Sequence, residues 1–113
     1  MGLCDEVAGL HPNIQAAMII RRLEVKERFV NKVVPIPPEE ELAKLFFRAE
    51  FLVSMTKESD NLFGRTGYVF TNHDTLDTFM FPLKDGILIV PVFKPYNHED
   101  LADRILKLAS VFP

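Results

Sequence analysis

The chain has 113 residues, 48% of them hydrophobic and 26% charged, which is the composition of a folded domain and not of a disordered segment. This length predicts a single domain over residues 1–113, large enough to bury a core without disulfides or metal ions. The formal net charge of −3 creates no field that would attract a polyanion, and the basic residues are scattered. Nucleic-acid binding is therefore disfavoured.

The cysteine content and the hydropathy of the chain indicate its cellular location. The single cysteine, Cys4, cannot form an intramolecular disulfide, which is compatible with a reducing cytoplasm. No window approaches the roughly 20 apolar residues that span a bilayer, and the acidic N-terminus lacks the regions of a signal peptide. We therefore expect a cytoplasmic protein with no membrane partner.

The first predicted element is a short helix, because Leu3, Val7 and Leu10 recur at helical spacing before Pro12 stops the segment. The run from Ile14 to Ile20 is almost continuously apolar and contains β-branched residues. Such a run is typical of a strand buried on both faces.

A second, more polar strand is predicted from Val25 to Val34. The connection from Arg21 to Glu24 contains neither glycine nor asparagine, so it carries only a weak hairpin signal. Pro35 and the pair Pro37-Pro38 then end the strand and open a long helix, in which three glutamates occupy the first turn.

This long helix, predicted from Pro37 to about Asn61, carries apolar residues on two opposite faces. One face suits the core, and the other needs a second partner, most simply another copy of the chain. The alternative is that the second stripe packs under the chain's own loops, or that the helix breaks near Ser54. The first face holds Leu42, Leu45, Phe46, Ala49, Leu52 and Val53, and the second holds Phe47, Phe51 and Met55.

Three further strands follow. The segments Tyr68–Thr71 and Thr75–Phe81 are joined by Asn72-His73-Asp74, a polar trio suited to a tight turn. The pair Asp85-Gly86 is the strongest hairpin signal in the chain, and it leads into the apolar run Ile87–Phe93.

A last helix is predicted after Asn97, which can cap it. Its apolar stripe comprises Leu101, Ile105, Leu108 and Phe112. The order is thus α-β-β-α-β-β-β-α, and hairpin-length connections predict a five-stranded antiparallel sheet with helices on both faces. The chain is thus predicted to be an α+β domain, and its element order is similar to that of the roadblock/profilin-like sandwich.

The element order resembles that of the roadblock superfamily, which contains dynein light chains and regulators of small GTPases. Local sequence adds to this resemblance, closest to an uncharacterised, largely archaeal group of roadblock-like proteins. The segments concerned are Cys4 with Leu10-His11-Pro12-Asn13-Ile14, Phe81-Pro82-Leu83, and His98–Leu108. The first turn departs from the usual pattern, because Arg22-Leu23 stands where a glycine is common.

The resemblance implies that the first and last helices share one face of the sheet, that the middle helix covers the other, and that dimers form through the middle helix and the third strand. The expected interface residues in this chain are Phe47, Phe51, Met55, Tyr68 and Phe70. The expected partners are a second copy and a further protein such as a small GTPase.

Few residues carry candidate chemistry. His73, Asp74 and Asp77 could supply part of a metal site, but no fourth ligand is evident, and a solvated turn is the better interpretation. A thiol nucleophile at Cys4, paired with His11, is disfavoured because the two residues lie seven positions apart with a proline break at Pro12, and because a buried free cysteine is a common core residue.

In the last helix His98, Glu99 and Asp100 are interpreted as residues of a capped first turn. The chain has no P-loop, dinucleotide-binding glycine pattern or paired-cysteine metal motif. We therefore expect no metal, no cofactor and no enzymatic activity.

Two functions remain open. The favoured one is a homodimeric interaction or regulatory module, and the alternative is a small-molecule-sensing domain. A ligand-binding domain should contain a sizeable apolar pocket with a few convergent polar groups, whereas an interaction module should show a filled core and an exposed apolar patch.

Overall fold

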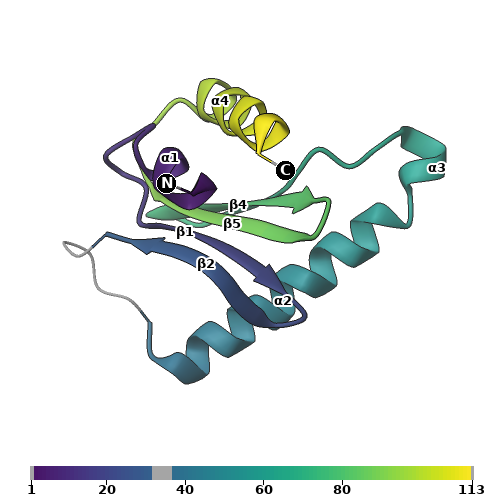
Figure 1. The fold of residues 1–113 in the computed structure, drawn as a ribbon, viewed down its shortest axis with the longest axis horizontal. Coiled ribbons are helices and arrows are strands. Elements are labelled where there is room, and N and C mark those ends of the chain that lie inside the picture. Colours follow the sequence, from purple (N-terminus) through teal and green to yellow (C-terminus); the bar gives the residue numbers. More distant parts are fainter. Residues whose placement is uncertain (1, 32–36, 113) are drawn as a thin grey trace.

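Five strands form one antiparallel sheet in the computed structural model, which describes residues 2–31 and 37–112. Their order is β2-β1-β5-β4-β3, so β2 and β3 are the edge strands (Figure 1). The predicted five-stranded antiparallel sheet is confirmed. The strands are β1 (Ala16–Arg21), β2 (Glu24–Val30), β3 (Val69–Asn72), β4 (Leu76–Leu83) and β5 (Gly86–Phe93).

Helices cover the sheet on both faces, as the sequence predicts. The helices α1 (Leu3–Ala8) and α4 (His98–Val111) lie on one face, and α2 (Glu39–Lys57) lies on the other (Figure 1). A further single turn, α3 (Asp60–Phe63), follows α2. No helix within the described ranges has both the length and the apolar character needed to cross a membrane.

The sheet separates two apolar clusters, because successive side chains of a strand point to opposite faces. In β4, Phe79 and Phe81 belong to the cluster under α1 and α4, whereas Met80 belongs to the cluster under α2. The α4-side cluster also takes Leu101 and Ile105 from the helix stripe predicted by the sequence. Leu108 and Phe112 extend that stripe as partly buried residues.

Helix α2 is continuous through Ser54 to Lys57, so the alternative of a break near Ser54 is wrong. The chain then passes directly into α3, and Gly64 ends it with a φ of +90°. Phe46, Ala49 and Val53 face the sheet as predicted. Leu45 was expected on the same face, but 42% of its surface is exposed.

The first hairpin closes through Arg22 and Leu23, whose φ angles are 52° and 68°. Positive φ at both central residues is the signature of a type I′ turn, which matches the twist of the flanking strands and normally uses asparagine and glycine. The sequence signal was weak because two residues with side chains adopt this strained conformation. Residues 32–36, which include the end of the predicted second strand and Pro35, lie outside the described residues.

The other turns follow the sequence prediction. Gly86 opens β5 with a φ of +116°, and a Cβ atom there would lie 2.5 Å from the carbonyl oxygen of Ile20. Only glycine therefore fits this hairpin. At the start of α4, Asn97 accepts a 2.9 Å hydrogen bond from the amide of Asp100, as expected of an N-cap.

Candidate interaction surface

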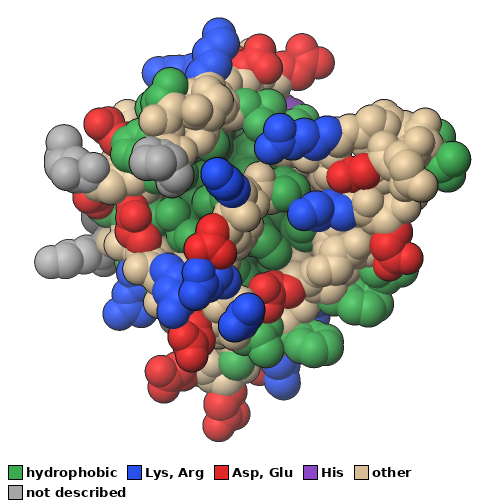
Figure 2. Space-filling view, turned by 45° about the vertical axis from the view of Figure 1, so that its right-hand side comes forward, with side chains coloured by type: hydrophobic (Ala, Val, Ile, Leu, Met, Phe, Trp, Pro, Cys, Tyr) green, Lys and Arg blue, Asp and Glu red, His purple; other side chains and the backbone are tan. Residues whose placement is uncertain are grey.

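The outer face of α2 exposes the second apolar stripe. Phe47, Phe51 and Met55 are 62%, 54% and 52% exposed, so the stripe does not pack under the chain's own loops. Hydrophobic side chains project from the surface over α2 and at α3 (Figure 2). Exposed phenylalanines at helical spacing are costly on an isolated monomer, and such patches commonly mark interaction sites.

The strained hairpin turn contributes to the same surface. Leu23, which is 49% exposed, lines a shallow groove together with Phe47 and Phe51 of α2. Lys44 and Arg48 also border this groove. Two elements distant in sequence thus present one apolar area, for which we use the name outer surface: Leu23, Phe47, Phe51 and Met55.

The short helix α3 adds a separate apolar tip. Leu62 and Phe63 are 76% and 85% exposed, and neither belongs to the two core clusters. Sequence periodicity did not single them out, because the predicted helix ended near Asn61.

Strand β3 offers a backbone edge of the sheet. It pairs with β4, with Phe70 opposite Phe79, and no described strand pairs with its other side. An open edge presents unpaired amide and carbonyl groups that can pair with another strand.

The structure does not gather all five expected interface side chains on one face. Tyr68 and Phe70 are partly buried on the α4 side of the sheet, opposite to α2. Their rings contact Phe79, at centroid distances of 5.6 and 4.9 Å. These two residues can therefore reach a partner only along the edge, and the residues of this strand that alternate toward α2 are Val69 and Thr71.

His98, in the first turn of α4, is also part of this aromatic cluster. Its Nε2 atom lies 3.1 Å from the hydroxyl oxygen of Tyr68, and its ring lies 4.3 Å from that of Phe70. His98 lies in the capped first turn of α4, as predicted, and its ring also contacts the sheet because this turn lies over the sheet.

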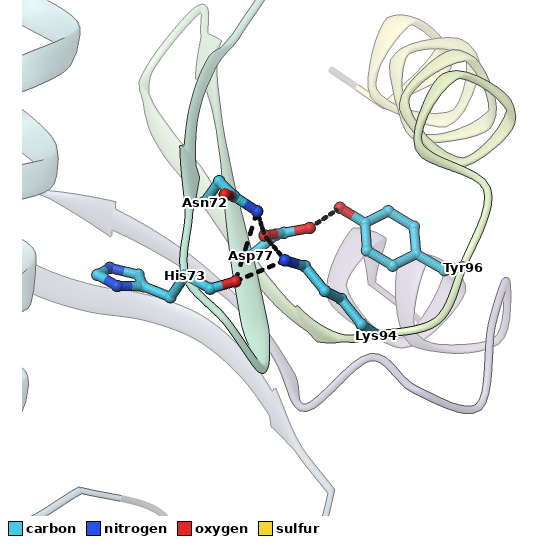
Figure 3. Close-up of polar contacts among 5 residues, drawn as sticks. All are labelled: Asn72, His73, Asp77, Lys94 and Tyr96. Atoms are coloured by element: carbon cyan, nitrogen blue, oxygen red, sulfur yellow. Dashed lines mark hydrogen bonds and ion pairs between the residues drawn. The ribbon is translucent and has the colours of Figure 1, made fainter.

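Asp77 is buried, although the sequence pattern indicated a solvated turn. It is 4% exposed, and its carboxylate accepts 2.6 Å hydrogen bonds from Asn72 and from the hydroxyl of Tyr96 (Figure 3). Burial raises the pKa of Asp77, but these two hydrogen bonds and the charge of Lys94 outweigh it and hold the pKa below its usual value. These hydrogen bonds link strands β3 and β4 to the segment before α4. The carboxylate of Asp77 therefore makes structural contacts.

The turn itself does not assemble a metal site around Asp77. His73 and Asp74 are exposed, and the His73 ring points away from the Asp77 network (Figure 3). Within residues 2–31 and 37–112, no three His, Cys, Asp or Glu residues form a group that could hold a metal ion.

Cys4 is a buried core residue. Burial, followed by the charge of Glu27 and a hydrogen bond to it, raises the pKa of the Cys4 thiol to about 12. Glu27 also accepts a 2.7 Å hydrogen bond from the Cys4 amide, and His11 accepts one from the Asn13 amide. A thiol held in its neutral form is a poor nucleophile.

A cavity of about 310 Å³ lies between α2 and the sheet. Its walls are mainly apolar, with Leu45 and Ala49 from the helix and Ala16, Thr71, Thr78 and Pro91 from the sheet. The structure therefore has both features that were expected to distinguish the two functions, an exposed apolar patch and an apolar pocket.

The arrangement of helices and strands is the roadblock fold. A roadblock/LC7 domain from Streptomyces avermitilis matches with a TM-score of 0.75 at 15% identity, over 96% of this chain and 89% of that one. The gliding protein MglB from Thermus thermophilus matches with a TM-score of 0.66 at 16% identity, over 96% and 86%. MglC from Myxococcus xanthus matches with a TM-score of 0.60 at 12% identity, over 96% and 90%.

Sequence comparisons add no closer relative. No protein-family model and no curated protein matches the chain. The likeness to these solved structures therefore establishes the fold.

Proposed function

We propose that the protein is a homodimeric, non-enzymatic regulatory module that pairs through α2 and the edge of β3 and recruits another protein. The observation that carries the proposal is the exposed stripe of Phe47, Phe51 and Met55, on a helix that already covers the core with its other face. Two phenylalanines near the centre of an interface are typical anchors.

The open edge of β3 supports the same arrangement. Pairing of two β3 edges would join two sheets and satisfy the unpaired backbone groups. The solved structure described as MglB with a tetrameric arrangement has the same fold, with a TM-score of 0.66 at 18% identity, so this fold is compatible with self-association.

The proposed partner is a small GTPase or another signalling protein, which follows from the resemblance to roadblock-type regulators. The non-enzymatic role rests on the structural use of the reactive groups: Asp77 is held by Tyr96 and Asn72, and Cys4 is buried beside Glu27. A single cysteine in the sequence suits the cytoplasm, where we propose that the protein acts.

Sedimentation analysis of surface variants tests the dimer. Phe51→Glu should weaken the dimer by roughly 30-fold or more, because truncating a central anchor costs about 2 kcal/mol or more. Phe51→Leu keeps an apolar side chain and should remain dimeric. Lys57→Glu places the same negative charge on an exposed α2 position away from the stripe, and it should also remain dimeric.

The partner assignment needs a separate readout. Purified small GTPases from the source organism would be titrated against the unmodified protein and against Phe63→Ser, because Phe63 of α3 lies outside the stripe assigned to the dimer. Binding that weakens in a surface variant supports recruitment, and absence of binding to every GTPase would redirect the search to other signalling proteins.

A further inference from the structure

The cavity under α2 exists because one cross-strand row of the sheet is built from small side chains. Thr71 of β3 lies opposite Thr78 of β4, and Thr78 lies opposite Pro91 of β5. Ala16 of β1 lines the cavity beside them, and Ala49 faces it from the helix. None of these side chains is long enough to fill the space between two layers.

The neighbouring row shows the contrast. There Met80 lies opposite Ile89, and Ile89 lies opposite Met18, so three long side chains occupy the same face of the sheet. All three are buried in the cluster under α2. These long side chains form the wall of the cavity on that side, and the row of small side chains beside them leaves the space open.

Polar groups converge on this hollow from the sheet and from its rim. The hydroxyls of Thr71 and Thr78 make no hydrogen bond to another residue in the described part of the chain. Arg48 of α2 and His73 of the β3–β4 turn line the cavity too. Within residues 2–31 and 37–112, the Arg48 guanidinium has no ion-pair or hydrogen-bonding partner, and the His73 ring points away from Lys94 and Asp77 (Figure 3).

We propose that this cavity binds a small apolar carboxylic acid, with its hydrocarbon part over Ala16, Thr78 and Pro91 and its carboxylate at Arg48 and His73. About 310 Å³ lies at the lower end of the range of small-molecule pockets, which are mainly apolar with a few polar groups that fix orientation. A guanidinium pairs with a carboxylate through two parallel hydrogen bonds. The Thr71 and Thr78 hydroxyls line the same cavity and supply further donors.

An apolar acid fits this lining better than a highly charged ligand. One arginine and one histidine cannot neutralise a polyphosphate, and the remaining walls would desolvate it without compensation. The cavity also differs from the outer surface, because it lies on the inner side of α2, between that helix and its own sheet. Arg48 borders both the cavity and the groove beside the outer surface, so the location of the bound ligand is tested separately from the dimer.

Calorimetric titration with octanoate tests the proposal, and 1-octanol serves as the uncharged ligand of the same length. The unmodified protein should bind octanoate at least about tenfold more tightly than 1-octanol, since a hydrogen bond to a charged group carries that much discrimination. Arg48→Gln should remove most of this preference. Lys44→Gln, which removes another α2 cation that does not line the cavity, should leave it unchanged.

A second variant tests the location. Thr78→Phe fills the cavity from the sheet and should abolish binding of both ligands while the protein keeps a cooperative melt. Chemical shifts of the backbone amides should change on octanoate addition at Ala16, Thr71, Thr78 and Ala49. Three results would overturn the proposal: no octanoate binding at millimolar concentration, a preference for octanoate over 1-octanol that is unchanged in Arg48→Gln, or shift changes confined to Phe47 and Phe51.

Discussion

The hydroxyl of Tyr96 donates a 2.6 Å hydrogen bond to Oδ2 of Asp77, which joins the segment before α4 to strand β4. The other carboxylate oxygen of Asp77 accepts a bond from Asn72 and lies 3.6 Å from Nζ of Lys94. Both carboxylate oxygens therefore have partners, as a buried carboxylate requires. The network fixes where the last helix begins relative to the sheet.

Tyr96→Phe removes one of these donors and leaves Oδ2 of Asp77 buried without it. We expect the free energy of unfolding to fall by about 1–3 kcal/mol, the cost of an unsatisfied buried polar group. Urea unfolding followed by circular dichroism measures this. Tyr68→Phe, which loses a bond to the ring nitrogen of His98, is the matched control and should cost less. Equal losses would contradict the assigned role of Asp77.

Because the pKa of Asp77 is lowered, the free energy of unfolding should depend on pH in the acidic range. A carboxyl group whose pKa is lower in the folded state contributes stability above its unfolded pKa, and this contribution is lost as the pH falls through its folded pKa, below 3.8. When the pH is lowered from neutral to below 3.8, the unmodified protein should therefore lose more stability than the Asp77→Asn variant. Parallel curves of melting temperature against pH for the two proteins would show that the carboxylate is not held as described.

Cys4 provides a test of the structure at alkaline pH. Its folded pKa of about 12 exceeds the ordinary value of 9.0, so the unfolded chain loses the thiol proton first as the pH rises. Stability from this group is present below pH 9.0 and is lost as the pH rises toward about 12. Folded protein should react with a thiol-specific disulfide reagent far more slowly than protein in denaturant. Comparable rates at pH 8 would contradict burial of the thiol.

The turn at Arg22 and Leu23 stores strain that a better turn sequence would release. Residues with side chains pay about 1–2 kcal/mol in the left-handed region, and asparagine and glycine tolerate it better. The double variant Arg22→Asn, Leu23→Gly should raise the free energy of unfolding by about 1 kcal/mol. It should also weaken the dimer, because the variant removes the Leu23 side chain from the outer surface. A destabilised variant would show that this turn does not carry the strain inferred from its φ angles.

Periodic patterns predicted most of the fold. The stripe of α4 and the two faces of α2 each reflect a residue spacing that the sequence displays directly. The second stripe of α2 was also the part of the candidate surface that could be found in this way, and the structure leaves Phe47, Phe51 and Met55 exposed.

The rest depended on contacts between distant segments. The burial of Asp77 requires Tyr96 and Asn72 to meet it, and the position of His98 follows from where α4 crosses the sheet. The cavity results from the register of β3, β4 and β5, which aligns Thr71, Thr78 and Pro91. No local sequence pattern indicates that register. Leu23 lies on the outer surface because of a turn whose residues, Arg22 and Leu23, are unfavourable for positive φ angles.

Light scattering of the unmodified protein over a dilution series tests the central claim, the dimer through α2 and β3, most directly. At micromolar concentration the account predicts a mass twice the 12.9 kDa of one chain, falling toward one chain only on extensive dilution. The same series on Phe51→Glu should give the mass of one chain throughout. A mass of one chain for the unmodified protein at every concentration would contradict the claim.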